Sequence, residues 1–201
     1  MNSTAIIILA AGSSSRFPGT KQLLHFNNKT LLQHVIDEAI ESGAEPTIVI
    51  TGANADEVEK EITQTNVQII RNENWKEGMA SSIVAGVKKT ITLNNDIEKI
   101  IIAVSDQPFV SSALFRQLYQ TQEKNVQHIV ACSYADTIGT PVLFTQNYFD
   151  ALMSLQGDEG AKKILKVNSN DVATVDFPQG AIDIDTRKDY NDLLDRQKHV
   201  L

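Results

Sequence analysis

Residues 5–21 read AIIILAAGSSSRFPGTK, and this stretch decides the fold that the sequence predicts. The unbroken apolar run over residues 5–10 is typical of a short strand that is buried on both faces. The small residues that follow predict a loop whose backbone a ligand can approach closely, and successive N–H groups in such a loop can bind an anion. Arg16 and Lys21 place two cations just beyond that loop. On these residues alone, a phosphate site and a flexible turn with two solvated cations are equally good interpretations.

The rest of the chain continues this alternation of strand and helix. Buried-strand patterns at 46–51, 67–70 and 99–104 alternate with helix patterns at 30–43, 54–64, 78–91 and 111–124. Such an order predicts a three-layer, Rossmann-like α/β fold, with helices on both faces of a mainly parallel sheet. Further on, the sequence predicts strands at 128–134, 141–145, 172–177 and 181–186, including a small antiparallel element, and helices at 147–155, 159–166 and 186–197.

Composition narrows the class of protein. The length of 201 residues predicts a single domain over 1–201. The net charge of −7, without a Lys/Arg run, argues against a protein that coats nucleic acid. No stretch approaches the length of a membrane span and residues 1–12 do not resemble a signal peptide, so we expect a cytoplasmic protein with no membrane partner. The lone Cys132 falls in a strand pattern, which predicts a small buried residue.

Four motifs together resemble one enzyme family. LAAGSSSRFPGTKQLL (9–24) is similar to the signature LAAGxSxRMGxxKxLL of the nucleotidyltransferase superfamily. NENWKEGMASSI (72–83), SDQPF (105–109), and GTPVLF (139–144) followed by LQGDEGAKKIL (155–165) resemble the molybdenum cofactor cytidylyltransferases and their MobA-like relatives. The chain departs from the pattern at Phe17, at the inserted Pro18 and at Thr140, where relatives commonly have Met, no residue and His. The resemblance implies a nucleotidyltransferase fold and nucleotidyl transfer.

Asp106 is the candidate metal ligand. It follows the strand pattern at 99–104, and ligands of open α/β sheets bind beyond the carboxyl ends of the strands. Mg²⁺ is usually held by one or two carboxylates and completed by substrate phosphates and water. From spacing alone a turn cap is slightly the better interpretation of Asp106, but the first loop and the resemblance favour the metal. The family has a late acidic residue near the metal, for which Asp185 is a better candidate than Asp183, and helix capping is an equally good role for it.

The resemblance also implies which residues contact the substrates. Arg16, Lys21 and Asp106 are the expected catalytic residues. Expected nucleotide contacts are the residues Leu9, Ala10, Ala11, Gly12, Ser13, Ser14, Arg16, Lys21, Thr51, Gly78 and Ser82. The expected acceptor side is Thr140, Pro141, Asp158 and Lys162, although Asp158 can also cap a helix. Trp75 is interpreted as a packing residue, with base stacking as the alternative, and Met79 as a core residue.

The implied substrates are CTP, or GTP as the second choice, and a molybdopterin-type acceptor, with Mg²⁺ as cofactor. Relatives that use CTP tend to have AAG in the first motif, as here at 10–12, and GTP users tend to have AGG. The product would pass to a molybdoenzyme or its maturation chaperone. Two alternatives stay open: a cytidylyl- or guanylyltransferase for a sugar or polyol phosphate, and a carrier that binds nucleotide or cofactor without turnover.

Overall fold

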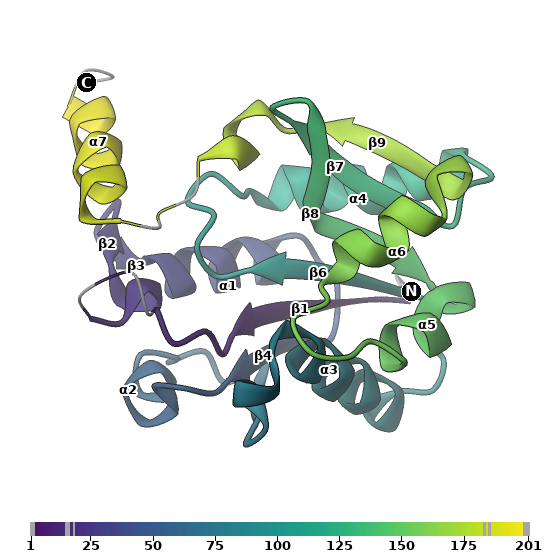
Figure 1. The fold of residues 1–201 in the computed structure, drawn as a ribbon, viewed down its shortest axis with the longest axis horizontal. Coiled ribbons are helices and arrows are strands. Elements are labelled where there is room, and N and C mark those ends of the chain that lie inside the picture. The colour runs from purple at the N-terminus through teal and green to yellow at the C-terminus, as the bar shows by residue number, and fades with distance from the viewer. Residues whose placement is uncertain (1–2, 15–16, 18, 183, 185, 199–201) are drawn as a thin grey trace.

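The computed structural model describes residues 3–14, 17, 19–182, 184 and 186–198. Its centre is a seven-stranded sheet in the order β5-β4-β1-β6-β8-β7-β9 (Figure 1). The strands are β1 (Thr4–Ala10), β4 (Thr47–Thr51), β5 (Val67–Arg71), β6 (Lys99–Val104), β7 (Ile129–Tyr134), β8 (Thr137–Thr145) and β9 (Val172–Asp176). Strand β8 pairs antiparallel with both β6 and β7, whereas the other pairs are parallel. The predicted parallel sheet with a late antiparallel element is therefore confirmed.

Helices cover both faces of this sheet, as Figure 1 shows. One face packs against α1 (Leu31–Glu41), α2 (Ala55–Lys60) and α4 (Ser112–Lys124), and the other against α3 (Met79–Leu93), α5 (Phe149–Met153) and α6 (Ala161–Val167). Successive side chains of a strand point to opposite faces. In β1, Ile7 and Leu9 thus belong to the core on the α3 side, and Ile6 and Ile8 to the core on the α1 side. This alternation decides which strand residues reach the site below.

Side chains cap the starts of two helices, and a third start is held differently. The hydroxyl of Thr30 accepts a hydrogen bond from the backbone N–H of Gln33 and caps α1. Thr186 and Asp189 form reciprocal bonds at the start of α7 (Arg187–Lys198). Before α2, however, the side chain of Asn54 makes no cap bond, and Glu57 accepts a hydrogen bond from Thr20 at 2.6 Å instead. That bond ties the end of the first loop to α2.

The chain ends on a separate small layer. Helix α7 lies beside the hairpin of β2 (His25–Phe26) and β3 (Lys29–Thr30), and Tyr190 donates to the carbonyl of His25 (Figure 1). The described part of the segment 181–186 forms no strand: a helical turn covers Pro178–Ala181, and Ile182 and Ile184 lie outside any strand. Within the described part of the chain, no helix is long and apolar enough to cross a bilayer.

Candidate active site

A cavity of about 510 Å³ opens at the carboxyl ends of β1 and β6, on the α3 side of the sheet. Its size lies in the range of small-molecule sites. Of the residues predicted from the motifs, those that line it are Leu9, Ala11, Gly12, Ser13, Ser14, Lys21, Gly78, Ser82, Asp106 and Asp158. Four motifs that are far apart in sequence thus contribute to one cavity.

A charged contact in the cavity wall joins Lys21 and Asp106. Lys21 Nζ lies 2.7 Å from Asp106 Oδ2, and the two side chains are 14% and 23% exposed. Lys21 comes from the helical turn Lys21–Leu23 after the first loop, and Asp106 from the loop after β6. Because β1 and β6 are neighbouring parallel strands, their loops leave the same edge of the sheet and bring these two side chains together. The pair puts a cation and a carboxylate at one point of the cavity wall.

Gln22 holds the first loop in shape, and the sequence analysis missed it. Its Nε2 donates to the carbonyls of Ala10 at 3.3 Å and Gly12 at 2.9 Å, and its Oε1 accepts from the hydroxyl of Ser14 at 3.2 Å. The same hydroxyl accepts from the backbone N–H of Lys21 at 3.0 Å. Ser14 has φ of 53°, a left-handed conformation that is uncommon outside glycine and needs such support. The sequence shows only that an amide side chain directly follows Lys21, because the partners of that amide depend on the folded loop.

The start of α3 forms the opposite wall. Gly78 precedes the helix with φ of 101°, and a Cβ built there would lie 2.3 Å from the carbonyl oxygen of Gly157. The backbone N–H of Ala80 donates to the same carbonyl at 3.1 Å. The loop before α6 therefore packs closely on the start of α3, which brings Asp158 into this cavity. Asp158 was predicted on the acceptor side, and the structure places it with the predicted nucleotide contacts.

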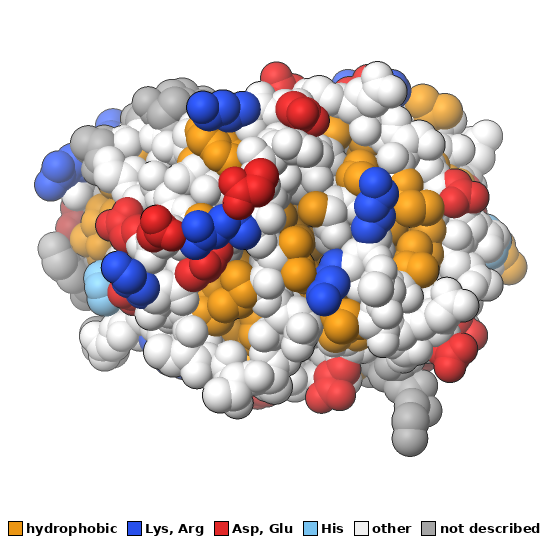
Figure 2. Space-filling view, turned by 90° about the horizontal axis from the view of Figure 1, so that it is seen from below, with side chains coloured by type: hydrophobic (Ala, Val, Ile, Leu, Met, Phe, Trp, Pro, Cys, Tyr) orange, Lys and Arg blue, Asp and Glu red, His pale blue; other side chains and the backbone are white. Residues whose placement is uncertain are grey.

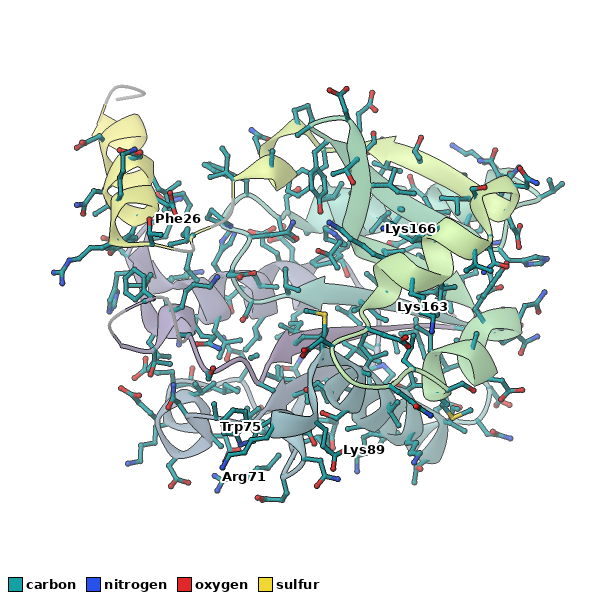
Figure 3. The ribbon with its side chains drawn as sticks, in the orientation of Figure 1. Phe26, Arg71, Trp75, Lys89, Lys163 and Lys166 are labelled. Atoms are coloured by element: carbon teal, nitrogen blue, oxygen red, sulfur yellow. The ribbon has the colours of Figure 1, made fainter. Side chains whose placement is uncertain are left out.

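Trp75 and Met79 complete this wall. Trp75 is half-buried, packs against the core on the α3 side and also lines the cavity, so its two predicted roles are compatible (Figure 3). A Cβ on Gly52 would lie 2.8 Å from the Cβ atoms of both Ala11 and Trp75, so these side chains approach closely across Gly52. The expectation that Met79 is a core residue is wrong: it is 48% exposed and lines the cavity, because it stands at the first turn of α3.

Two predicted nucleotide contacts face away from the cavity. Ala10 belongs to the core on the α1 side, where alternation along β1 places it. Thr51 is fully buried and donates a hydrogen bond of 2.6 Å to Glu59 of α2. Glu59 also accepts from Arg71, and this bond is the main reason that the pKa of Glu59 is held below its usual value. Thr51 is thus part of a polar network beside the sheet.

The predicted acceptor residues do not gather at the first cavity. The carbonyl of Thr140 accepts from Gln107 Nε2 at 3.1 Å, and Thr140 and Pro141 line neither described cavity. Lys162 lines a second cavity between α6 and the β7–β8 hairpin. The predictions for Arg16, Asp183 and Asp185 lie outside the described residues.

The donor set suits a metal that arrives with a phosphate ligand. Of the residues that the structure describes, Asp106 and Asp158 are the two carboxylates in the lining of the first cavity. Among the described residues no group of three or more His, Cys, Asp or Glu side chains is placed to hold a metal. One or two carboxylates, completed by substrate phosphates and water, are the usual ligands of Mg²⁺, so the residues present fit this ion.

Cys132 has no part in this site. It is buried in β7, and burial raises the pKa of its thiol to about 12. The thiolate is the reactive form, so this cysteine is unreactive in the folded protein at neutral pH.

Comparison with known proteins agrees with this geometry. The model of the MobA-like NTP transferase domain matches residues 6–174. Nicotine blue oxidoreductase of Paenarthrobacter nicotinovorans is 28% identical over 80% of each chain, and the molybdenum cofactor cytidylyltransferase of Escherichia coli is 23% identical over 94% of this chain and 95% of that one. The crystal structure of Rv0371c from Mycobacterium tuberculosis superposes with a TM-score of 0.81 at 28% identity, covering 96% and 97% of the chains.

A further crystal structure of Rv0371c, in complex with manganese, has a TM-score of 0.77 at 26% identity and covers 96% of this chain and 98% of that one. The family match covers most of the chain, and the sheet with helices on both faces is the Rossmann-like arrangement of nucleotidyltransferases. The chain belongs to the MobA-like NTP transferase domain family.

Proposed function

We propose that the protein transfers CMP from CTP to the terminal phosphate of a molybdenum-molybdopterin cofactor and releases pyrophosphate. The observation that carries the proposal is the contact of 2.7 Å between Lys21 and Asp106 in the wall of a nucleotide-sized cavity. A lysine that can bind phosphate and a carboxylate that can bind a metal are the two groups that a triphosphate requires at one point.

The reaction needs positioning more than proton transfer. An oxygen of the acceptor phosphate bonds to the α-phosphorus of CTP, and the bond from that phosphorus to the oxygen bridging to the β-phosphate breaks. A phosphate monoester has a second pKa near 6, so at pH 7 the attacking group is largely the dianion and no strong base has to deprotonate it. Phosphoryl-type transfer of this kind depends on alignment and on charge stabilisation.

The residues of the chain supply those two effects. Lys21 stabilises negative charge on the triphosphate and on the leaving pyrophosphate, and Arg16 is proposed to act beside it. Gln22 keeps the carbonyls of Ala10 and Gly12 turned inward, which fixes the course of the loop that the phosphates would contact.

Asp106 is proposed to hold Mg²⁺, with Asp185 as a second candidate ligand. Bound there, the ion would neutralise charge on the phosphates. Before the nucleotide binds, Lys21 pairs with the carboxylate of Asp106, so this partly buried charge is not left unpaired. The nucleotide then competes for Lys21.

The cavity wall also supports CTP as the nucleotide. Ala11 is only 7% exposed and packs close to Trp75 across Gly52. Its methyl group narrows the space beside the indole ring, which disfavours the larger purine of GTP. Trp75 offers an apolar surface on which a base can stack.

The acceptor is the least constrained part of the proposal. The motifs 72–83 and 155–165 both contribute to the first cavity, through Gly78, Ser82 and Asp158, and a sugar or polyol phosphate transferase does not account for them. One relative in the comparison is named a molybdenum cofactor cytidylyltransferase, but another is named an oxidoreductase. Family membership alone therefore does not choose the reaction.

A screen of nucleotides against acceptors tests the proposal. Pyrophosphate release is measured with CTP, GTP, ATP and UTP, each with Mg²⁺ and with molybdenum-molybdopterin, a sugar phosphate or a polyol phosphate. We expect release with CTP and molybdenum-molybdopterin, and formation of the cytosine dinucleotide cofactor by mass spectrometry. Release with a sugar phosphate would favour the first alternative, and CTP binding without any release would favour the carrier.

A further inference from the structure

A second cavity, of about 750 Å³, lies between α6 and the β7–β8 hairpin. Its wall combines hydroxyl groups, lysines and apolar side chains, from the residues Ser133, Tyr134, Ala135, Asp136, Thr137, Ile138, Lys162, Leu165, Lys166 and Ser169. None of these residues lines the first cavity. The two cavities are therefore separate spaces with different walls.

Charge distinguishes the second cavity from the chain as a whole. Lys162 and Lys166 stand one turn apart on α6, and Asp136 is the acidic residue in the same wall, so the lining is net positive. The complete chain carries a net charge of −7. On the lower face of the molecule, by contrast, Lys and Arg side chains lie scattered among Asp and Glu (Figure 2).

The three lysines of α6 differ in their partners. Lys163 Nζ lies 2.6 Å from Glu159 Oε1, whereas Lys162 and Lys166 have no acidic partner within 4 Å among the described residues. Figure 3 shows Lys163 and Lys166 on this helix. Asp136 lines the same cavity but forms no ion pair with either lysine, so two ammonium groups without an ion-pair partner in the described part of the chain favour an anionic ligand.

The stem of Lys162 is also held against the sheet. A Cβ built on Gly139 would lie 3.5 Å from Lys162 Cε and 2.3 Å from the hydroxyl oxygen of Tyr134. Gly139 therefore gives both side chains the room to lie over β8. Tyr134 packs edge-on against Phe177 with ring centroids 6.3 Å apart, which fixes this side of the cavity.

Two short links join the second cavity to the transfer centre. Gln107, next to Asp106, donates to the carbonyl of Thr140, and Thr140 follows Gly139 in β8. Along the other wall, Asp158 lines the first cavity and Lys162 lines the second, and they are separated by a single turn of chain. The two cavities are thus connected by short stretches of chain, and a ligand with two separated groups is the kind that such a pair of sites suits.

We propose that the second cavity binds an anionic part of the acceptor, distant from the phosphate that reacts, and that Lys162 and Lys166 hold it. This assignment rests on the proposed function, because an acceptor is needed only if the protein transfers a nucleotidyl group. Lys162 was expected on the acceptor side, and the structure adds Lys166, the hairpin wall and the separation of this site from Asp106.

Lysine footprinting tests the site without turnover. The protein is acetylated briefly at its lysines, alone or with CTP and Mg²⁺, with inorganic phosphate, or with the acceptor that supports pyrophosphate release, and each lysine is quantified by mass spectrometry. We expect the acceptor to slow the modification of Lys162 and Lys166 several-fold and CTP to slow that of Lys21. Lys163 is the matched control on the same helix and should not change.

The kinetic counterpart uses the double variant K162Q/K166Q, which changes exposed side chains and should fold normally. Loss of two charged contacts should raise the KM for the acceptor by roughly tenfold or more and leave the KM for CTP unchanged. K163Q should leave both values unchanged.

Each outcome of the footprint has a distinct meaning. An active acceptor that does not protect Lys162 and Lys166 overturns the proposed site and leaves the proposed reaction standing. If no acceptor supports pyrophosphate release, the proposed reaction is wrong, and the second cavity is then tested with inorganic phosphate alone. Protection of these two lysines by phosphate then supports an anion site, and its absence overturns it.

Discussion

Strands β1 and β4 lie side by side and run parallel, and their last residues, Ala10 and Thr51, are paired in register. Both of these residues point to the α1 side of the sheet. After β1 the chain continues with Ala11 on the α3 side, and its loop returns through Lys21 to the cavity. After β4, Thr51 is bonded to Glu59, and Gly52 serves as a close-packing point between Ala11 and Trp75. Neighbouring strand ends thus differ in structure: one leads into the proposed transfer centre, and the other packs beneath it.

The largest expected effect is at Lys21, on the β1 side of this comparison. Lys21→Met keeps the apolar stem but removes the charge beside Asp106, and we expect kcat for pyrophosphate release to fall by about 100-fold or more. Lys60→Met, at the exposed end of α2, is the control and should be silent. Activity of Lys21→Met within twofold of wild type would show that the β1 loop does not carry the chemistry.

A smaller and pH-dependent effect is expected at Gln22. In Gln22→Glu a carboxylate replaces the amide that donates to Ala10 and Gly12, so kcat/KM for CTP should fall roughly tenfold at pH 8. Burial raises the pKa of such a carboxyl, and the protonated form regains one donor. The activity relative to wild type should therefore rise as the pH falls through this raised pKa.

The control for this variant is Gln117→Glu on the exposed side of α4. It should follow wild type at every pH. If kcat/KM for CTP of Gln22→Glu followed the same pH profile as wild type, Gln22 would not position the loop for catalysis, even if the variant were less stable.

Substitutions at Ala11 and Ala10 test directly which face of the sheet contacts the nucleotide, because the two alanines lie in opposite cores. Removing the Ala11 methyl group widens the cavity, so Ala11→Gly should raise kcat/KM for GTP relative to CTP by about 3- to 5-fold, the effect of one methyl group. Ala10→Gly is the matched control, because Ala10 lies in the other core and should change stability but not the nucleotide ratio. Equal ratios in the two variants would contradict the assignment of faces.

The smallest expected effect on catalysis is at Thr51. Thr51→Val removes its bond to Glu59 and should lower the free energy of unfolding by about 1 kcal/mol, with the KM for CTP unchanged. Because the pKa of Glu59 is lowered in the folded state, the stability linked to its charge is present above the usual carboxyl value of 4.5 and is lost as the pH falls through the folded value. The difference between variant and wild type in urea unfolding should therefore shrink in acid. A raised KM for CTP with an unchanged free energy of unfolding would indicate that Thr51 contacts the nucleotide.

Much of the fold was predictable from the sequence because its strands are continuous apolar runs. The buried patterns at 46–51, 67–70 and 99–104 identified β4, β5 and β6 in the right order. In the described part of the predicted strand at 181–186 no strand forms, and Ile184 instead packs in one cluster with Phe26 and Leu31. Alternation over so few residues suits either arrangement. Pairing along a sheet edge is not encoded in so short a segment.

The site was predictable in part, because several of its residues follow directly after buried strands or fall in the motifs. The motifs correctly predicted that Lys21, Gly78 and Asp106 lie at one cavity. The alternation of faces would have excluded Ala10 and Thr51 had it been applied at the strand ends. Gln22 and the placement of Asp158 depend on contacts between segments that only the folded chain brings together.

We propose that Asp106 and Lys21 form the point at which the nucleotide reacts. The most direct test is pyrophosphate release from CTP, with Mg²⁺ and the acceptor, by Asp106→Asn, with Asp150→Asn on α5 as control. Asparagine is nearly the same size but loses the charge. We expect release by Asp106→Asn to fall by about 100-fold or more, while the variant stays folded by circular dichroism and the control keeps normal activity. Release at the wild-type rate in Asp106→Asn would contradict the proposal.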